Sequence, residues 1–429
     1  MSRNSRWIVA GAGTALAMLF AALSRIEGLN DRVGLFLALY FAAFGVYLLT
    51  LFVLGRSSAA VRSRRLLVLV FAVAALSRVV LIPAQPVMST DIYRYLWEGR
   101  MITHGFSPFS HAPEADELES LRDENYDGIN HKNLETIYPP VSQAVFALAA
   151  GIRPDLQTQK LIFVLFDLGV ILLIGAILRL RSIDPAAAAV YAWNPLVIFE
   201  TGHSGHLEPV GIFFLLLGLY LVARGKRLGG FAALGLSFLA KYLSVVFVPY
   251  FLARRKYAAW VGVMAAVVVA GYLPFAGAGA GLFSSLKLYS AEWQFNGLFY
   301  KVTDTVLNDP LWSRRLLTLA VGFVVIYQAF RQKDPVRFGF VAVATGLLLA
   351  PTLYPWYVAW IVPFLCFYRN RAWILFTGLV MVSYRVWTFD AAGGAWELPW
   401  RIYAVEYVPF YALLLYDAFR GRPGKEAVA

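Results

Sequence analysis

Residues 33–55 read VGLFLALYFAAFGVYLLTLFVLG, an apolar run without a charged residue between Arg32 and Arg56. A membrane-spanning α-helix needs about 17–25 mostly apolar residues. Because the bilayer core has no water to bond to the backbone, such a run can cross it only as a helix that satisfies its own hydrogen bonds. The stretch therefore predicts an integral membrane protein.

The composition of the whole chain agrees with this prediction. Of its 429 residues, 59% are hydrophobic and 15% are charged, whereas soluble domains carry about 25% charged residues. The net charge of +12 would suggest a nucleic-acid partner if the basic residues formed a patch. They lie instead in small clusters between apolar runs, so we expect no nucleic acid. The single cysteine, Cys366, excludes an intrachain disulfide and a Cys-based metal site.

Further apolar runs predict about fourteen crossings in an all-α, polytopic transmembrane bundle. The longer runs are 7–24, 33–55, 66–83, 160–179, 208–223, 257–275, 311–330, 371–388 and 400–419, and the shorter ones are 185–201, 229–241, 243–254, 336–352 and 355–368. Run 7–24 is interpreted as a retained helix rather than a signal peptide, because no small-residue cleavage site follows it.

The basic residues predict the orientation, because cytoplasmic loops are enriched in Lys and Arg. With Arg3 and Arg6 in the cytoplasm, nearly every later basic cluster, as far as Lys425, falls on the same side if residues 139–151 do not cross. That segment is about thirteen residues long, too short to span at about 1.5 Å per residue. We expect it to form a helix on the outer surface of the membrane.

Residues 229–254 lie between two basic clusters and must leave and re-enter the cytoplasmic side within about 25 residues. We therefore expect a broken helix pair that turns near Lys241. Non-helical backbone at membrane depth is tolerated only where it is buried in protein or lines a cavity, so this pair should border one.

Polar residues concentrate in two expected extracytoplasmic loops, 84–159 and 276–310. In the first loop, a helix would place Asp91, Arg94, Tyr95 and Glu98 on one face. The adjoining face, with Ile92, Leu96 and Gly99, is expected to rest on the membrane. An acidic residue in a first helical turn also complements the helix dipole, which is the structural alternative for Asp91.

The order of motifs along the chain resembles the glycosyltransferase C (GT-C) superfamily, and most closely its polyprenyl-phosphate-mannose-dependent branch, which includes the GPI mannosyltransferase I type. The motifs are Asp91-Ile-Tyr-Arg94-Tyr95, Gly105-Phe-Ser-Pro-Phe109, Tyr138-Pro-Pro140, Trp193-Asn-Pro195 with Gly202-His203, Leu239-Ala-Lys241, Trp293-x-x-Asn296 and Tyr354-Pro-Trp356-Tyr357. The resemblance covers about residues 64–420. It implies a catalytic module over 64–429, with residues 1–63 as an N-terminal two-helix extension in the membrane.

The resemblance implies transfer of a hexose, with mannose expected, from a polyprenyl-phosphate donor to a hydroxyl of a lipid-linked or cell-envelope glycan. The site would face the extracytoplasmic side of the inner or plasma membrane. Such a reaction needs a general base, worth about 10²–10⁴-fold, and Asp91 is the expected one. Arg94, Lys241 and Arg78 are candidates to stabilise the leaving phosphate, although the last two could instead snorkel to the interface.

The other side chains expected at the substrate are Tyr95, Glu98, Tyr138, His203, His206, Glu208, Trp293, Asn296, Tyr354 and Trp356. Some GT-C enzymes carry an Asp-x-Asp or Glu-x-Asp pattern, but here Asp91 is followed by Ile92 and Tyr93. His203 and His206 alone supply half of a zinc site. We therefore expect neither a metal nor another cofactor. Asp167 and Glu406, within spanning segments, are expected in buried pairs.

A multi-pass transporter or flippase of a lipid or sugar is the alternative, since transporters also use broken helices near the middle of the membrane. Transporters usually show internal repeats and small outer loops. This chain has no visible repeat and a long outer loop that carries acidic residues, which favours the enzyme.

Overall fold

The computed structural model describes residues 3–56, 64–391 and 396–420, and in these residues it contains helices and connecting segments but no strand. The helices are α1 (Arg3–Leu23), α2 (Val33–Arg56), α3 (Arg64–Val79), α4 (Asp91–Thr103), α5 (Pro140–Ile152), α6 (Leu156–Leu180), α7 (Ala189–Ala192), α8 (Pro195–Gly202), α9 (Glu208–Ala223), α10 (Arg227–Ala240), α11 (Phe247–Leu252), α12 (Arg255–Tyr272), α13 (Ser284–Glu292), α14 (Leu298–Leu307), α15 (Pro310–Arg331), α16 (Pro335–Leu349), α17 (Val362–Leu365), α18 (Arg371–Leu379), α19 (Val386–Asp390) and α20 (Trp400–Phe419). The predicted all-α class is confirmed for this part of the chain.

Five helical stretches in the described residues are long and apolar enough to cross a membrane. They are Val33–Arg56, Leu156–Leu180, Arg255–Glu292, Pro310–Arg331 and Arg371–Asp390. Several other expected crossings form shorter apolar helices, among them α9, α10 and α16. The total of about fourteen crossings stays a prediction from apolar length.

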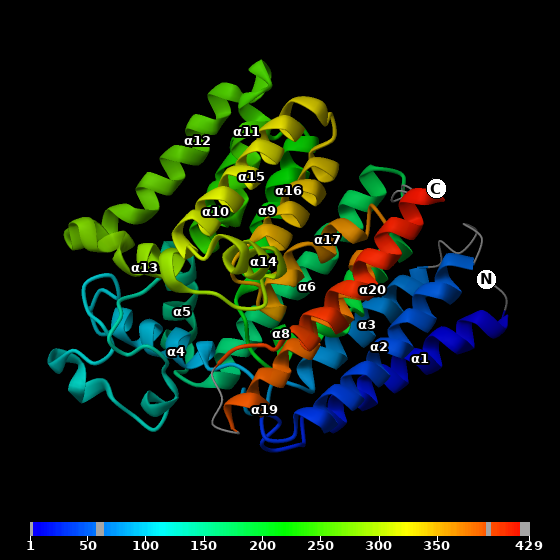
Figure 1. Ribbon diagram of the computed structural model, residues 1–429, viewed down its shortest axis with the longest axis horizontal. Helices are drawn as coiled ribbons and strands as arrows, with labels where there is room; N and C mark the ends of the chain where they lie inside the picture. The colour runs from blue at the N-terminus through cyan, green and yellow to red at the C-terminus, as the bar shows by residue number, and fades with distance from the viewer. Residues whose placement is uncertain (1–2, 57–63, 392–395, 421–429) are drawn as a thin grey trace.

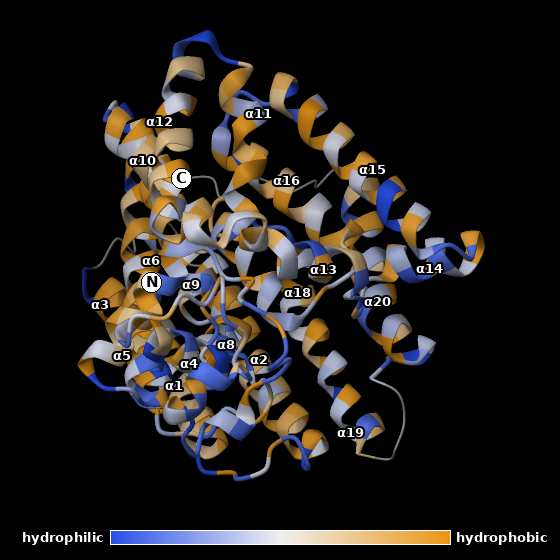
Figure 2. Cartoon of the chain, turned by 90° about the vertical axis from the view of Figure 1, so that its left-hand side faces the viewer, coloured by the Kyte–Doolittle hydropathy of each residue, from blue (hydrophilic) through white to orange (hydrophobic). Residues whose placement is uncertain are grey.

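In Figure 2, hydrophobic residues predominate along long peripheral helices such as α12 and α15. On α15, for example, Leu319, Phe323 and Phe330 are each at least 70% exposed. Contiguous apolar surface of this kind marks an interaction site with another protein or a membrane. Together with the apolar lengths, it indicates that these faces contact lipid.

The first two helices pack into the same core as the rest of the bundle (Figure 1). The Tyr40 hydroxyl of α2 donates to the Thr377 carbonyl of α18, and the Tyr47 hydroxyl donates to the Val190 carbonyl. The expected boundary between extension and module falls at residues 57–63, outside the described residues, as do Lys425 and the side chains of Arg3 and Arg6. The division at residue 63 stays a prediction.

Proline and a short polar residue begin several helices. Asn194 caps α8, Asp309 caps α15 and Asp334 caps α16, and in each case the side-chain oxygen accepts a backbone N–H while proline takes the first helical position. Proline is favoured there because its missing N–H has no partner in the first turn. These start signals mark where α8, α15 and α16 begin.

A buried ion pair joins α3 to α6. The Arg78 guanidinium contacts the Asp167 carboxylate, and both side chains are fully buried. Arg78 also donates to the Ala192 carbonyl at 2.9 Å, and Asp167 accepts from the Tyr191 hydroxyl. Removing one partner of such a pair costs about 3–5 kcal/mol. The buried pairing expected for Asp167 is confirmed, and that of Glu406 is confirmed by a 2.7 Å hydrogen bond from the Asn296 amide.

Helices α4 and α5 pack against each other at one end of the molecule (Figure 1). The face of α4 expected to rest on the membrane is instead covered by α5, so that expectation is wrong. Ile92 and Leu96 are buried in one apolar cluster with Phe146 of α5, and a Cβ added at Gly99 would lie 2.3 Å from the Phe146 carbonyl oxygen. The apolar side of α5 covers this face of α4, so the face is buried in protein and does not contact lipid.

The predicted extracytoplasmic position of residues 84–159 can be tested by thiol labelling. Ser110 and Gln157 are exposed, whereas Cys366 is buried. In a Cys366→Ala background, Ser110→Cys and Gln157→Cys should both react with a membrane-impermeant reagent added outside intact cells. Reaction of Gln157→Cys only after the membrane is opened would contradict the arrangement.

Candidate active site

A cavity of about 640 Å³ opens among elements that are distant in sequence. Its walls are the start of α4, residues 130–139, the break at Lys241, helix α13 and residues 354–357. The break predicted near Lys241 is present in the structure. Helix α10 ends at Ala240, and the backbone of Lys241 is extended, with φ −154° and ψ 128°. The volume lies within the range of about 300–1,000 Å³ typical of small-molecule sites.

Asp91 is the first residue of α4 and lines the cavity. Its Oδ1 accepts a hydrogen bond from the Asn130 amide at 3.1 Å, and the side chain is 23% exposed. Burial raises the pKa of this carboxyl above its ordinary value, while the Asn130 bond and the charges of Lys241, His131 and Arg94 oppose the rise. Asp91 is therefore a carboxylate held in place at the cavity wall, with an oxygen that a substrate can reach.

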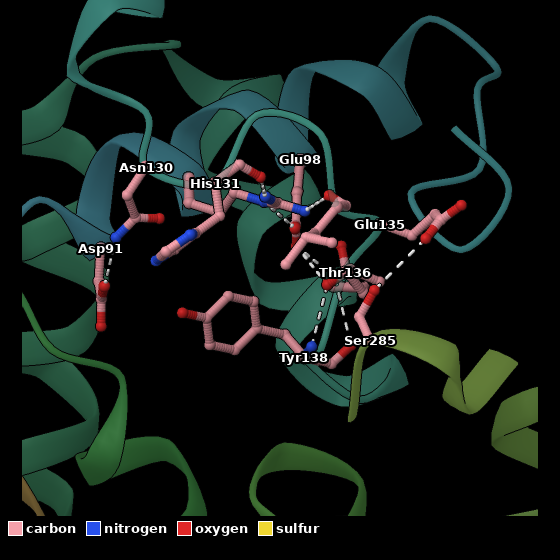
Figure 3. A network of polar contacts seen from close by, with 11 residues as sticks. Asp91, Glu98, Asn130, His131, Glu135, Thr136, Tyr138 and Ser285 are labelled. Carbon is pink, nitrogen blue, oxygen red and sulfur yellow. Dashed lines mark hydrogen bonds and ion pairs between the residues drawn. The ribbon is translucent and has the colours of Figure 1, made fainter. Parts of the chain in front are cut away.

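Glu98, which Figure 3 shows near Thr136, acts with Arg94 to hold the 131–136 segment against α4. Arg94 pairs with Glu98 at 2.7 Å and donates to the carbonyls of His131 and Leu134. Glu98 is fully buried and also accepts from Thr136 at 2.8 Å and from Gln143 at 2.6 Å. Arg94 lines the cavity but Glu98 does not, so this network positions the wall.

Lys241 is the cation that extends into the cavity from the helix break. Its ammonium donates to Oε1 of Glu208 at 2.7 Å, and its side chain is 22% exposed. It also lies 5.2 Å from the centre of the Tyr357 ring. An ammonium has three N–H donors, so one bond to Glu208 leaves capacity for an anion.

Aromatic rings form one side of the cavity. Tyr354 stacks between Phe295 and Trp356, with ring centres 4.7 and 4.5 Å away. Trp293 contacts the His131 ring at 4.8 Å, and its carbonyl accepts from Arg314 and Thr352. Aromatic faces of this kind, beside polar groups, can cover the apolar face of a sugar ring.

Comparison with known proteins identifies the family of this chain. The family model described as alpha-(1->6)-mannopyranosyltransferase, N-terminal domain, matches residues 7–255. The chain belongs to this family. The GT-C mannosyltransferase resemblance is thereby confirmed at the level of the family. The match begins within α1 and so includes most of α1 and all of α2.

A curated relative supports the assignment. The chain is 24% identical over 176 residues to alpha-(1->6)-mannopyranosyltransferase A of Corynebacterium glutamicum. The aligned stretch covers 40% of this chain and 35% of that relative. The family match contains the expected site residues from Arg78 to Lys241, whereas Trp293, Asn296, Tyr354 and Trp356 lie beyond it.

The cavity brings together about half of the residues that the sequence singles out. Asp91, Arg94, Tyr138, Lys241, Trp293, Tyr354 and Trp356 line it. The others lie outside the lining: Arg78, Tyr95, Glu98, His203, His206, Glu208 and Asn296.

The residues outside the lining have protein partners. Arg78 pairs with Asp167, and Tyr95 packs on Tyr138 and Phe146. His203 stacks on Phe199 with ring centres 4.5 Å apart. Their expected contacts with substrate stay predictions. The shared helical face or the motif order shows that residues are near one another, but not which of them the neighbouring helix covers.

Sequence reasoning misses several cavity residues, notably Asn130, His131, Glu135, Ser285 and Gln294. Figure 3 shows Asn130 beside Asp91, and Glu135 next to Ser285. His131 has a φ of 46°, a left-handed conformation that is uncommon outside glycine. The sequence gives no helical period in this segment, so the only signal was the density of polar residues in the loop.

Among the residues that the structure describes, no three His, Cys, Asp or Glu side chains gather closely enough to hold a metal ion. The expected independence from metal stays a prediction.

Proposed function

We propose that this chain transfers mannose from a polyprenyl-phosphate donor to a hydroxyl of a lipid-linked or cell-envelope glycan, at the extracytoplasmic face. Asp91 acts as the general base. The observation that carries the proposal is that the Asp91 carboxylate and the Lys241 ammonium open onto one cavity in a chain of the alpha-(1->6)-mannopyranosyltransferase family. The activity for which the Corynebacterium relative is named suggests an α-(1→6) linkage.

In the proposed reaction the acceptor hydroxyl gives its proton to Asp91 while its oxygen forms a bond to the anomeric carbon. The bond from that carbon to the phosphate oxygen breaks, and the electron pair leaves with the polyprenyl phosphate. The donor is a phosphodiester and the product a monoester, so negative charge grows on the phosphate. Lys241 stabilises that charge, and preorganised cations of this kind act most strongly where charge develops.

The proposal is tested by looking for a new covalent bond. Purified protein in vesicles, given polyprenyl-phosphate mannose and a mannoside acceptor, should form a glycan one hexose longer. It should also release one polyprenyl phosphate for each bond. A flippase would move the lipid between leaflets and leave it chemically unchanged.

We expect the pH dependence to reflect Asp91. A base works only when deprotonated, so kcat/KM should fall as the pH drops through the pKa of the Asp91 carboxyl. Because that pKa is raised, the fall should come at a higher pH than for an ordinary aspartate. A kcat/KM profile that stays flat down to about pH 4, the ordinary aspartate range, would contradict the assignment.

We expect transfer to proceed without a divalent ion, because Asp91 lacks the neighbouring acidic residue of metal-using relatives. The rate in EDTA should equal the rate in magnesium or manganese. Loss of transfer in EDTA that either ion restores would contradict this, and would point to Asp91 and Glu135, two of the cavity carboxylates, as ligands.

A further inference from the structure

His206 lies beside Asp91 but outside the cavity lining. Its Nδ1 is 3.9 Å from Oδ2 of Asp91, and its Nε2 is 3.5 Å from Oε2 of Glu200. The ring stacks on Trp356, with centres 3.9 Å apart and planes at 17°. The His206 and Glu200 side chains are 1% and 2% exposed, so this is a buried row of polar groups that ends at the cavity.

The row is not joined by hydrogen bonds in this structure. Within the described part of the chain, neither ring nitrogen of His206 nor Oε2 of Glu200 has a hydrogen-bond partner. Buried polar atoms are paired in the large majority of cases, so an exception requires an explanation. Catalytic hydrogen bonds are often long in unliganded enzymes and tighten when substrate binds. If the distances from Nδ1 to Oδ2 of Asp91 and from Nε2 to Oε2 of Glu200 each shortened by about 1 Å or less, the three side chains would be joined by hydrogen bonds.

Burial determines which atoms of Glu200 and His206 carry protons. Oε1 of Glu200 accepts from the Tyr384 hydroxyl at 2.8 Å, and no Lys or Arg of the described residues forms an ion pair with Glu200. A buried carboxylate without a cation is costly, so Glu200 carries a proton, on the free Oε2. That proton faces Nε2 of His206. A neutral imidazole that accepts at Nε2 has its own proton on Nδ1, which faces Asp91.

We infer that His206 is a positioning residue for Asp91, donating from Nδ1 to Oδ2 of the ionised carboxylate, and that Glu200 fixes its tautomer. The inference deepens the proposed function and rests on it. With Asn130 bonded to Oδ1, both carboxylate oxygens are held, and the rotamer that faces the acceptor is fixed. A hydrogen bond to the charged form favours that form. Removing it should therefore raise the pKa of Asp91.

Other charged and titratable groups act on Asp91 and must be kept constant in any test. They are Arg94, His131, Lys241 and Glu208, together with the tyrosines Tyr95, Tyr138, Tyr289, Tyr354 and Tyr384.

The test uses variants that separate stacking from donation. His206→Asn puts an amide donor near the place of Nδ1, whereas His206→Phe keeps the ring and removes the donor. The carboxyl band of Asp91, identified as the infrared band missing in Asp91→Asn, is titrated in purified full-length protein alongside the kcat/KM profile. Two midpoints are compared: that of the Asp91 infrared titration and that of the acid limb of the kcat/KM profile. His206→Phe should raise both midpoints by about one to two pH units, and His206→Asn should leave them near the wild-type values.

Two controls complete the test. Glu200→Gln should leave both midpoints in place, because its amide donates to Nε2 as a protonated carboxyl does. His203→Phe, at a buried histidine that stacks on Phe199 and has no recorded contact with Asp91, should also leave them in place. Unshifted midpoints in folded His206→Phe would overturn the inference, as would a Glu200→Gln shift equal to that of His206→Phe.

The infrared titration also separates the two hypotheses. If the kcat/KM profile of Asp91→Asn kept its acid limb, the base would lie elsewhere and the proposed function would need revision. The Asp91 band would still report whether His206 donates to Asp91.

Discussion

Asp91→Asn should transfer sugar about two orders of magnitude or more slowly than the wild type, with donor binding retained. Asparagine keeps the shape of the side chain and, at the first position of α4, loses only a dipole interaction of about 0.3–1 kcal/mol, but it cannot take a proton. If Asp91 only complemented the dipole of α4, the change would cost little. Turnover should be measured with saturating donor, and donor affinity separately.

Asp116→Asn is the matched control, since Asp116 is an exposed aspartate in the same loop and does not line the cavity. It should behave as wild type. Normal turnover of Asp91→Asn would contradict the assignment. Glu98 would not then be the base, because it is fully buried and its oxygens accept from Arg94, Thr136 and Gln143. The next candidate would be Glu135, a carboxylate in the cavity wall.

Lys241→Met should weaken donor binding about tenfold to hundredfold, because a hydrogen bond to a charged group contributes about 1.5–3 kcal/mol. The variant also leaves the Glu208 carboxylate buried without its cation, which could impair folding by itself. The double variant Glu208→Gln/Lys241→Met removes that unpaired charge. Donor affinity is measured for both variants in vesicles.

The double variant distinguishes two roles of Lys241, binding of the donor phosphate and neutralisation of Glu208. If Lys241 binds the donor phosphate, the double variant should fold as well as Glu208→Gln and still bind donor weakly. If Lys241 only neutralises Glu208, the double variant should recover wild-type affinity. Lys287→Met, at an exposed position on α13, should leave donor affinity unchanged and serves as the control.

Much of the fold could be predicted from the sequence because membrane insertion is governed by apolar length. The helices on either side of the break at Lys241, and helices α4 and α5, follow from runs of residues and from proline or polar start signals. The position of the α4 side chains could not be predicted. Helical period shows which residues share a face, but the apolar face of α4 suits a lipid surface and the surface of α5 equally well.

The cavity could be predicted only in part. Asp91 is predicted from the motif order and from its place at the start of a helix in the first outer loop. Lys241 is predicted from the break between two short apolar runs, where an ionisable residue at membrane depth is costly and so indicates function. The segment from Asn130 to Glu135 was missed because backbone carbonyls hold it, at His131 and Leu134, through Arg94. A bond to a carbonyl requires no particular residue type at the accepting position, so it leaves no trace in the sequence.

The central claim is that this chain itself moves mannose from a polyprenyl phosphate. The most direct measurement gives the purified protein in vesicles one labelled donor at a time, either polyprenyl-phosphate mannose or GDP-mannose, with a mannoside acceptor. Label in the product should appear with the lipid donor, join through an α-(1→6) bond and depend on Asp91. Label that appears only with GDP-mannose, or product formation that is equal in Asp91→Asn, would contradict the account.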